Sequence, residues 1–170
     1  DDEHEDGQVA ARLRDDPEFD EMDAAHNIIT TSFMRGLALF DHAITTGEAE
    51  SAALAKQRLV ATANAARDLN AVSHWWTATL ASHLIDELWH LSLYEQIPIL
   101  PPDDDDYERW SNLRRGYIQR LRARQRSAIE LWPSQLDAAA RAVNSEDDLV
   151  VALPTSAGKT RIAEICILRA

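Results

Sequence analysis

The sequence predicts a mainly α-helical chain: a helical bundle over about residues 19–130, followed by the start of an α/β unit over residues 131–170. Two observations lead to this prediction. Apolar side chains recur every three or four residues through four long stretches before residue 130, which is the period of an amphipathic helix. Near residue 150, a short apolar run precedes a glycine-containing loop and another helical pattern, the order strand, loop, helix.

Composition favours a soluble protein with a separate acidic arm. The chain has 170 residues and a net charge of −12, and residues 1–23 carry eleven acidic residues against two arginines. We therefore expect residues 1–18 to form an acidic flexible arm. The single cysteine, Cys166, excludes an internal disulfide and fits a reducing compartment, so we expect a cytoplasmic protein without a membrane span.

Three helices are predicted in the first part of the bundle, over about residues 19–46, 48–69 and 71–95. The second is rich in alanine, which lets helices approach closely, so we expect it to be central. The third is apolar over more than half of its girth, which is typical of a helix largely buried within a bundle. Prolines at positions 98, 101 and 102 end it.

A fourth helix is predicted over about residues 107–130, with Asp103 to Asp106 at its positively polarised start. It carries seven of the chain's fifteen arginines: Arg109, Arg114, Arg115, Arg120, Arg122, Arg124 and Arg126. One interpretation is that they contact nucleic-acid phosphates. The other, which the overall acidity favours, is that they pair with Asp103 to Asp106, with the acidic arm or with a partner subunit.

The loop between residues 153 and 160 has the features of a phosphate-binding loop. It reads Leu-Pro-Thr-Ser-Ala-Gly-Lys-Thr and lies between the apolar run 149–152, a predicted strand, and a helical pattern that begins at Arg161. Backbone N–H groups of such a loop wrap phosphates, and the helix start adds its positive end. Lys159 is expected to reach the β- and γ-phosphates of ATP, and the Thr160 hydroxyl to bind Mg²⁺.

Residues 154–160 closely resemble motif I of superfamily 2 helicases, especially the Ski-type branch and its DEAD/DEAH-box relatives. Leu153 stands where the general pattern has glycine, and the early glycines are often replaced in that branch. The resemblance covers about residues 129–170 and implies the beginning of an incomplete RecA-like ATP-binding domain over residues 131–170. The nucleotide-binding residues expected from it are Gln135, Thr155, Ser156, Ala157, Gly158, Lys159, Thr160 and Arg161, of which Lys159 and Thr160 are also the expected catalytic residues.

Gln135 resembles the glutamine of the helicase Q-motif region, because an amide offers one donor and one acceptor to adenine. Ser134 is expected to cap a helix over about residues 135–143, with Asp137 three residues further on. Leu131 or Trp132 is expected to pack beside the base. A second chemical possibility is a metal site at His83, Glu87 and His90, which share one face of the third helix with Asp86 adjacent.

Two classes of function follow. In the first, the chain is the amino-terminal part of an ATP-dependent helicase or translocase that acts on DNA or RNA, and its helical extension is a regulatory or partner-docking module. The resemblance weakly extends to helicases of bacterial anti-phage defence, including Hachiman-type systems that pair a helicase with a nuclease. In the second, the chain is a helical interaction module that docks a nuclease or other effector without motor activity.

The fragment alone is expected to be inactive, since the remaining helicase motifs would follow residue 170. A P-loop kinase or GTPase fits less well, because it leaves Gln135 and the helical region unexplained.

Overall fold

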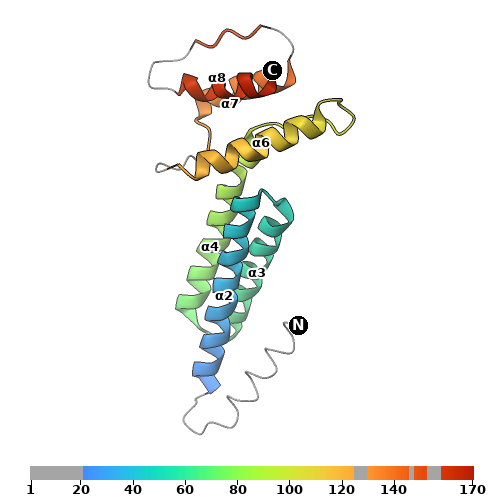
Figure 1. The fold of residues 1–170 in the computed structure, drawn as a ribbon. Coiled ribbons are helices and arrows are strands. Elements are labelled where there is room, and N and C mark those ends of the chain that lie inside the picture. The colour runs from blue at the N-terminus through green and yellow to red at the C-terminus, as the bar shows by residue number, and fades with distance from the viewer. Residues whose placement is uncertain (1–20, 125–129, 146–147, 153–157) are drawn as a thin grey trace.

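The computed structural model describes residues 21–124, 130–145, 148–152 and 158–170, and within them the chain is mainly helical (Figure 1). The helical prediction is therefore confirmed. The strand predicted over residues 149–152 is not: residues 148–152 form neither helix nor strand, and Val150 is 91% exposed. A strand needs a hydrogen-bonded neighbour, and the described residues supply no other strand to pair with. The RecA-like domain stays a prediction.

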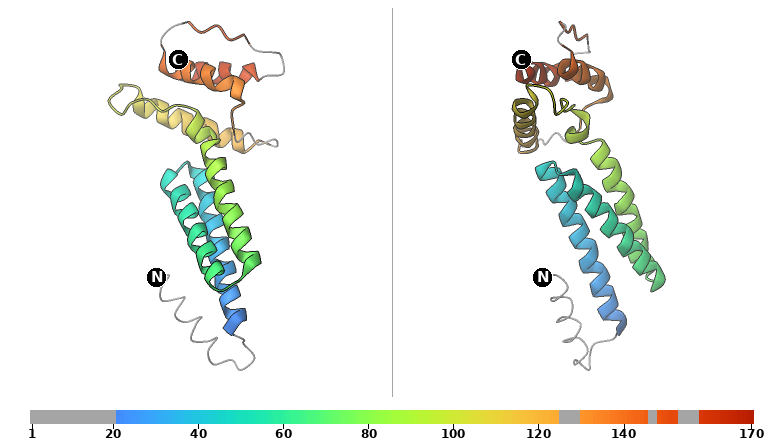
Figure 2. Two further views of the ribbon diagram at one scale, coloured as in Figure 1. Left: turned by 180° about the vertical axis from the view of Figure 1, so that it is seen from behind. Right: turned by 90° about the vertical axis from the view of Figure 1, so that its right-hand side faces the viewer.

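The long part of the molecule is a layer of three antiparallel neighbours, α2 (Glu21–Thr46), α3 (Ala49–Asp68) and α4 (Val72–His90). The central place predicted for the alanine-rich helix is confirmed: α3 packs along both α2 and α4, which meet each other at few points (Figure 2). Their shared core includes Phe40, Leu59 and Ile85. Gly47 makes the turn into α3 with φ +82°, a left-handed conformation that favours glycine.

The third predicted helix is shorter and less buried than expected. It ends at His90 and is followed by the short helix α5 (Leu93–Gln96). Side chains on its outer face, including Trp76, Leu80 and Leu84, are exposed, so the prediction of a largely buried helix is wrong. The reason is the layer itself, because α3 covers one face of α4 and no described helix covers the opposite one.

A second core lies above the end of this layer, where α6 (Tyr107–Arg122) crosses it and carries α7 (Pro133–Asn144) and α8 (Lys159–Arg169) (Figure 1). The buried side chains of this core come from α5, α6, α7, α8 and the segments between them: Leu93, Tyr94, Ile97, Leu100, Trp110, Ile118, Leu121, Leu131, Ala139, Val143, Ile162 and Ile165. The fourth predicted helix ends at residue 122 rather than 130, directly after Leu121, its last buried residue. Helices in proteins are held mainly by packing of their apolar face.

Arg114 fastens α6 to the segment before it. Its side chain is buried, and it donates hydrogen bonds from Nε to the Ile97 carbonyl (2.7 Å) and from Nη2 to the Tyr94 carbonyl. Burial lowers the pKa of Arg114 to about 10, so the guanidinium is still charged at neutral pH. This arginine is therefore an internal tether, a role that neither sequence interpretation assigned to it.

Candidate nucleotide site

The described end of the phosphate-binding motif is the start of α8. Thr155, Ser156 and Ala157 lie outside the described residues. Gly158 is the N-cap of α8, with φ +71° and ψ 37°, and Lys159 and Thr160 form the first turn. A Cβ at Gly158 would collide with Nε2 of Gln135, so both the backbone conformation and the close approach require glycine here.

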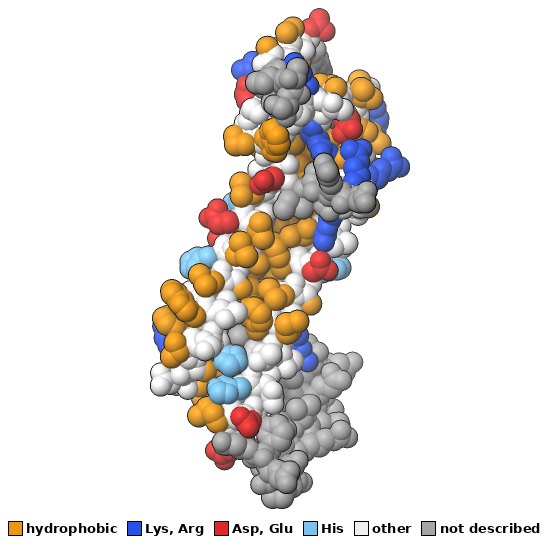
Figure 3. All heavy atoms as spheres, turned by 90° about the vertical axis from the view of Figure 1, so that its left-hand side faces the viewer, with side chains coloured by type: hydrophobic (Ala, Val, Ile, Leu, Met, Phe, Trp, Pro, Cys, Tyr) orange, Lys and Arg blue, Asp and Glu red, His pale blue; other side chains and the backbone are white. Residues whose placement is uncertain are grey.

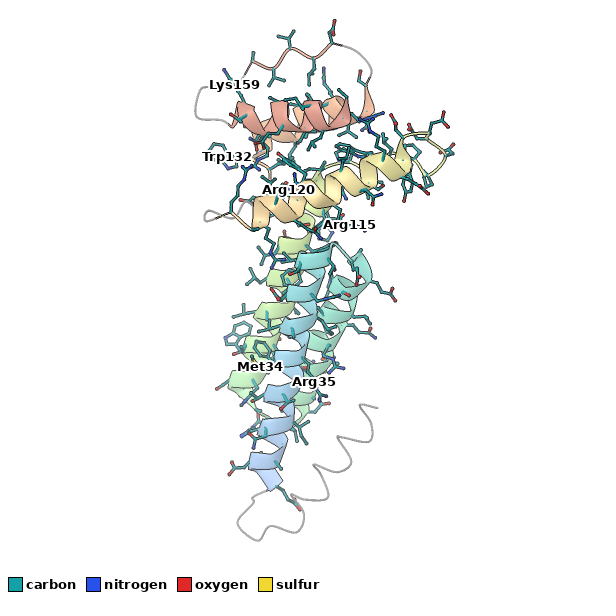
Figure 4. All side chains as sticks on the ribbon, viewed as in Figure 1. Met34, Arg35, Arg115, Arg120, Trp132 and Lys159 are labelled. Atoms are coloured by element: carbon teal, nitrogen blue, oxygen red, sulfur yellow. The ribbon has the colours of Figure 1, made fainter. Side chains whose placement is uncertain are left out.

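Lys159 and Thr160 are both exposed on this first turn, and Lys159 projects outward in Figure 4. Among the described residues, Lys159 makes no ion pair or hydrogen bond. An exposed ammonium beside the positively polarised start of a helix is a suitable arrangement for phosphate. The side chains present therefore fit the triphosphate and Mg²⁺ that the motif implies.

Gln135 ties the start of α7 to the end of the phosphate loop. It is 5% exposed; its Nε2 donates to the Gly158 carbonyl (2.9 Å), and its Oε1 accepts from the Trp132 N–H (2.8 Å). The residue predicted from the sequence therefore contacts Gly158, which is 23 positions away in the chain. The amide nitrogen and oxygen already have backbone partners, so contact with adenine stays a prediction.

The cap of α7 differs from the predicted one. Trp132, not Ser134, is the N-cap; Pro133 is the first helical residue and Gln135 the third. The Gln135 N–H donates to the Trp132 carbonyl (2.7 Å), while the Gln135 side chain accepts from the Trp132 N–H, so the pair caps the helix reciprocally. Proline prefers the first helical position, which shifts the start by two residues relative to the predicted one.

Of the two side chains expected beside the base, only one has free surface. Leu131 is 2% exposed and packs in the upper core, whereas Trp132 is 53% exposed. In Figure 4, Trp132 and Lys159 lie on the same side of this part of the molecule. Trp132 is therefore the aromatic ring available to a ligand at this site.

Arg161 points to a cluster around Glu164, one turn further along α8. Tyr117 on α6 donates its hydroxyl to Glu164 Oε2 (2.6 Å), and Arg124 Nη2 lies 3.6 Å from Oε1. Arg161 Nη1 is 3.9 Å from Oε2 and is buried with no hydrogen-bond partner among the described residues. Burial and the bond to Glu164 raise the pKa of Tyr117, which keeps its hydroxyl protonated. No local pattern indicates this link between α6 and α8, because its partners are 47 residues apart in the chain.

The arginines of the predicted fourth helix, over about residues 107–130, differ in their partners. Pairing with an acid is observed for three of them: Arg109 with Asp106 (3.7 Å), Arg122 with Asp41 (3.1 Å) and Arg124 with Glu164. Asp106 also binds Arg169 of α8 at 2.8 Å, which lowers the pKa of that carboxyl. The exposed Arg115 and Arg120 have no such pair within the described residues, and Arg126 lies outside them.

The histidine and carboxylate face of α4 has other partners. Asp86 pairs with Lys56 of α3 at 2.7 Å, and His90 Nδ1 lies 2.7 Å from the Asp86 carbonyl oxygen. The lysine lowers the pKa of Asp86, and the backbone hydrogen bond raises that of His90. Within the described ranges no group of three or more histidine, cysteine or acidic side chains has metal-site geometry. None of the described helices is long and apolar enough to cross a membrane.

Comparison with known proteins gives one informative similarity. No family model matches the chain. Over 127 residues, 74% of the chain, it is 29% identical to the Hachiman protein HamB of Bacillus cereus. The match covers 11% of that protein, so the chain spans about a tenth of the length of the curated relative it resembles.

Proposed function

We propose that the chain is the amino-terminal part of an ATP-dependent helicase or translocase of a Hachiman-type anti-phage defence system. The observation that carries the proposal is the junction at Gly158. There a left-handed glycine starts α8, and the buried Gln135 amide holds the loop carbonyl 2.9 Å away. The similarity to HamB over most of the chain supports the defence role.

In this proposal the nucleotide binds around the first turn of α8. Lys159 contacts the β- and γ-phosphates, Thr160 holds Mg²⁺, and Gln135 with Trp132 contacts adenine. Gln135 also has a positioning role, because its amide fixes the loop end on α7. Arg161, held near Glu164, lies at the base of the same turn. Hydrolysis and movement along DNA or RNA belong to the full-length protein.

The test is the ATPase rate of the full-length protein with and without single-stranded DNA and RNA, beside Lys159→Ala. We expect stimulation by one nucleic acid and its loss in the variant. Lys56→Ala is the matched control, since it removes a lysine that pairs with Asp86 in the bundle. Hydrolysis that ignores nucleic acid would point to another class of P-loop enzyme, and equal rates for the two lysine variants would refute the assignment of Lys159.

The second candidate is a helical interaction module that docks a nuclease or other effector without motor activity. The exposed apolar outer face of α4 favours it, because such faces mark contact surfaces. If neither the full-length wild type nor its Lys159→Ala variant hydrolyses ATP, the result would favour this candidate.

A further inference from the structure

The outward face of α6 carries a strip of basic and amide side chains, opposite the face that is buried in the upper core. With 3.6 residues per turn, Asn112, Gly116 and Gln119 lie between Arg115 and Arg120 around the helix. Gly116 is half-buried and the four side chains around it are exposed. No acidic residue occurs between Arg109 and Arg124. Figure 3 shows Lys and Arg side chains gathered where α6 crosses the end of the bundle. We call these five residues the α6 strip.

The fold does not use the two arginines of the strip. Within the described residues, Arg115 and Arg120 (Figure 4) make no ion pair with an acid and no side-chain hydrogen bond. The other described arginines of residues 107–124 are engaged by carbonyls or carboxylates: Arg109, Arg114, Arg122 and Arg124. In a chain with 29 acidic and 17 basic residues, two exposed guanidinium groups without an acidic partner are an exception. Their charge is available to an external anion.

Gly116 lies between these arginines without a structural reason to be glycine. A Cβ at this position would meet nothing within 4 Å, and its φ is not positive. Glycine inside a helix destabilises it, so neither packing nor backbone conformation explains the residue. The missing side chain lowers the helix surface at the centre of the strip, which lets a polymer backbone lie directly against α6.

We propose that the α6 strip binds the phosphate backbone of a nucleic-acid strand, with Arg115 and Arg120 holding phosphates on either side of Gly116. The planar guanidinium group matches a phosphate with two parallel hydrogen bonds. The Asn112 and Gln119 amides add donors for phosphate or sugar oxygens. The choice of nucleic acid as the partner rests on the proposed function, whereas the anion-binding strip rests on the contacts described above.

The side chains of the strip favour a nucleic acid over an acidic protein segment. Protein interfaces are organised around buried aromatic or aliphatic anchors. The strip has none, and the only exposed large apolar side chain on α6 is Leu113, which is 37% exposed and lies beyond Arg120. Phosphate contacts need no such anchor, because charge alone supplies affinity and position. The net charge of −12 opposes binding of a strand elsewhere on the chain, so the strip determines where the strand lies.

Fluorescence anisotropy with the full-length protein, without ATP, tests the proposal. The probes are fluorescein-labelled single-stranded DNA and RNA of equal length. Each lost phosphate contact lowers the slope of log affinity against log salt by about 0.7. The Arg115→Gln/Arg120→Gln double variant should therefore lose about 1.4 in slope and about 25-fold in affinity at 0.1 M salt, if affinities converge at 1 M. Arg67→Gln is the control: this exposed arginine of α3 lies 3.9 Å from Asp68, and its loss should change affinity by less than about twofold.

Gly116→Leu separates contact with a strand from damage to the fold. The added side chain has room, and leucine favours a helix, so the thermal midpoint should rise while nucleic-acid affinity falls. Affinity equal to wild type in Gly116→Leu would refute the close approach of the strand.

The outcomes for the α6 strip are distinguishable from those for the motor. A double variant that binds like the wild type, in a protein whose ATPase responds to nucleic acid, would overturn the strip and leave the proposed function intact. Loss of binding in the double variant, in a protein that hydrolyses no ATP, would support the strip and refute the motor. Displacement of the probe by poly-glutamate as readily as by unlabelled nucleic acid would overturn the proposal in favour of an acidic protein segment.

Discussion

Tyr117→Phe should loosen the attachment of α8 to α6. The hydroxyl of Tyr117 is 2.6 Å from Glu164 Oε2, and the Glu164 side chain is 30% exposed. A hydrogen bond to a charged group contributes roughly 1.5–3 kcal/mol, and water reaching the partly exposed carboxylate replaces some of it. We therefore expect the free energy of unfolding to fall by about 1–2 kcal/mol.

Urea unfolding followed by tryptophan fluorescence measures this loss. With a urea dependence of about 2 kcal/mol per molar, the midpoint should fall by roughly 0.5–1 M. Tyr107→Phe on the same helix is the control, because the Tyr107 hydroxyl makes no hydrogen bond to the described residues. Amide hydrogen exchange should rise in α8 and stay unchanged in α3. Equal midpoints for the two variants, or no faster exchange in α8, would refute the view that Tyr117 holds α8.

Three further predictions concern the junctions between elements. Gly158→Ala should destabilise the chain by at least about 1–2 kcal/mol, because left-handed strain and the contact of its Cβ with Gln135 Nε2 act together. Urea unfolding measures the loss, and the variant should also weaken nucleotide binding in the full-length protein; a variant as stable as wild type would contradict this reasoning. Arg114→Met should cost about 2–4 kcal/mol because it leaves two buried carbonyls unpaired, while Arg115→Met on the exposed face should change stability by less than about 0.5 kcal/mol. The hydrogen bond from Arg169 lowers the pKa of Asp106 below its ordinary 3.8. The stability that this ion pair contributes is therefore present above about pH 4 and is lost as the pH falls. Acid titration of Asp106→Asn should show a shallower loss of stability than that of the wild type.

Much of the helical architecture could be predicted from local pattern. The starts of α3, α4 and α6 lie within one residue of the predicted positions, because apolar spacing and helix-ending residues act over a few neighbours in the chain. The alanine content of α3 also predicted its central position correctly. Gln135 was singled out for its chemistry, and the structure brings it to Gly158.

The incorrect predictions share one cause, because each outcome depends on how elements distant in the sequence pack against one another. The fourth helix stops at the end of its buried face, and residues 148–152 lack a strand partner. Trp132 and Gln135 cap α7 together because Pro133 prefers the first helical position. None of these outcomes follows from hydrophobic period or residue propensity alone.

The sequence by itself determined the helices, the acidic balance and the glycine at position 158, since each depends on a residue's own chemistry or its near neighbours. Tertiary structure decided which charges pair and which apolar faces are covered. Arg114 ties α6 to the segment before it, and Arg122 and Arg124 pair with acidic side chains. The apolar side chains of Val72 and Trp76 on α4 are exposed. The physical reason is distance along the chain: these contacts join residues 17 to 81 positions apart, and a periodic pattern gives a helix an apolar face without specifying which neighbour covers it.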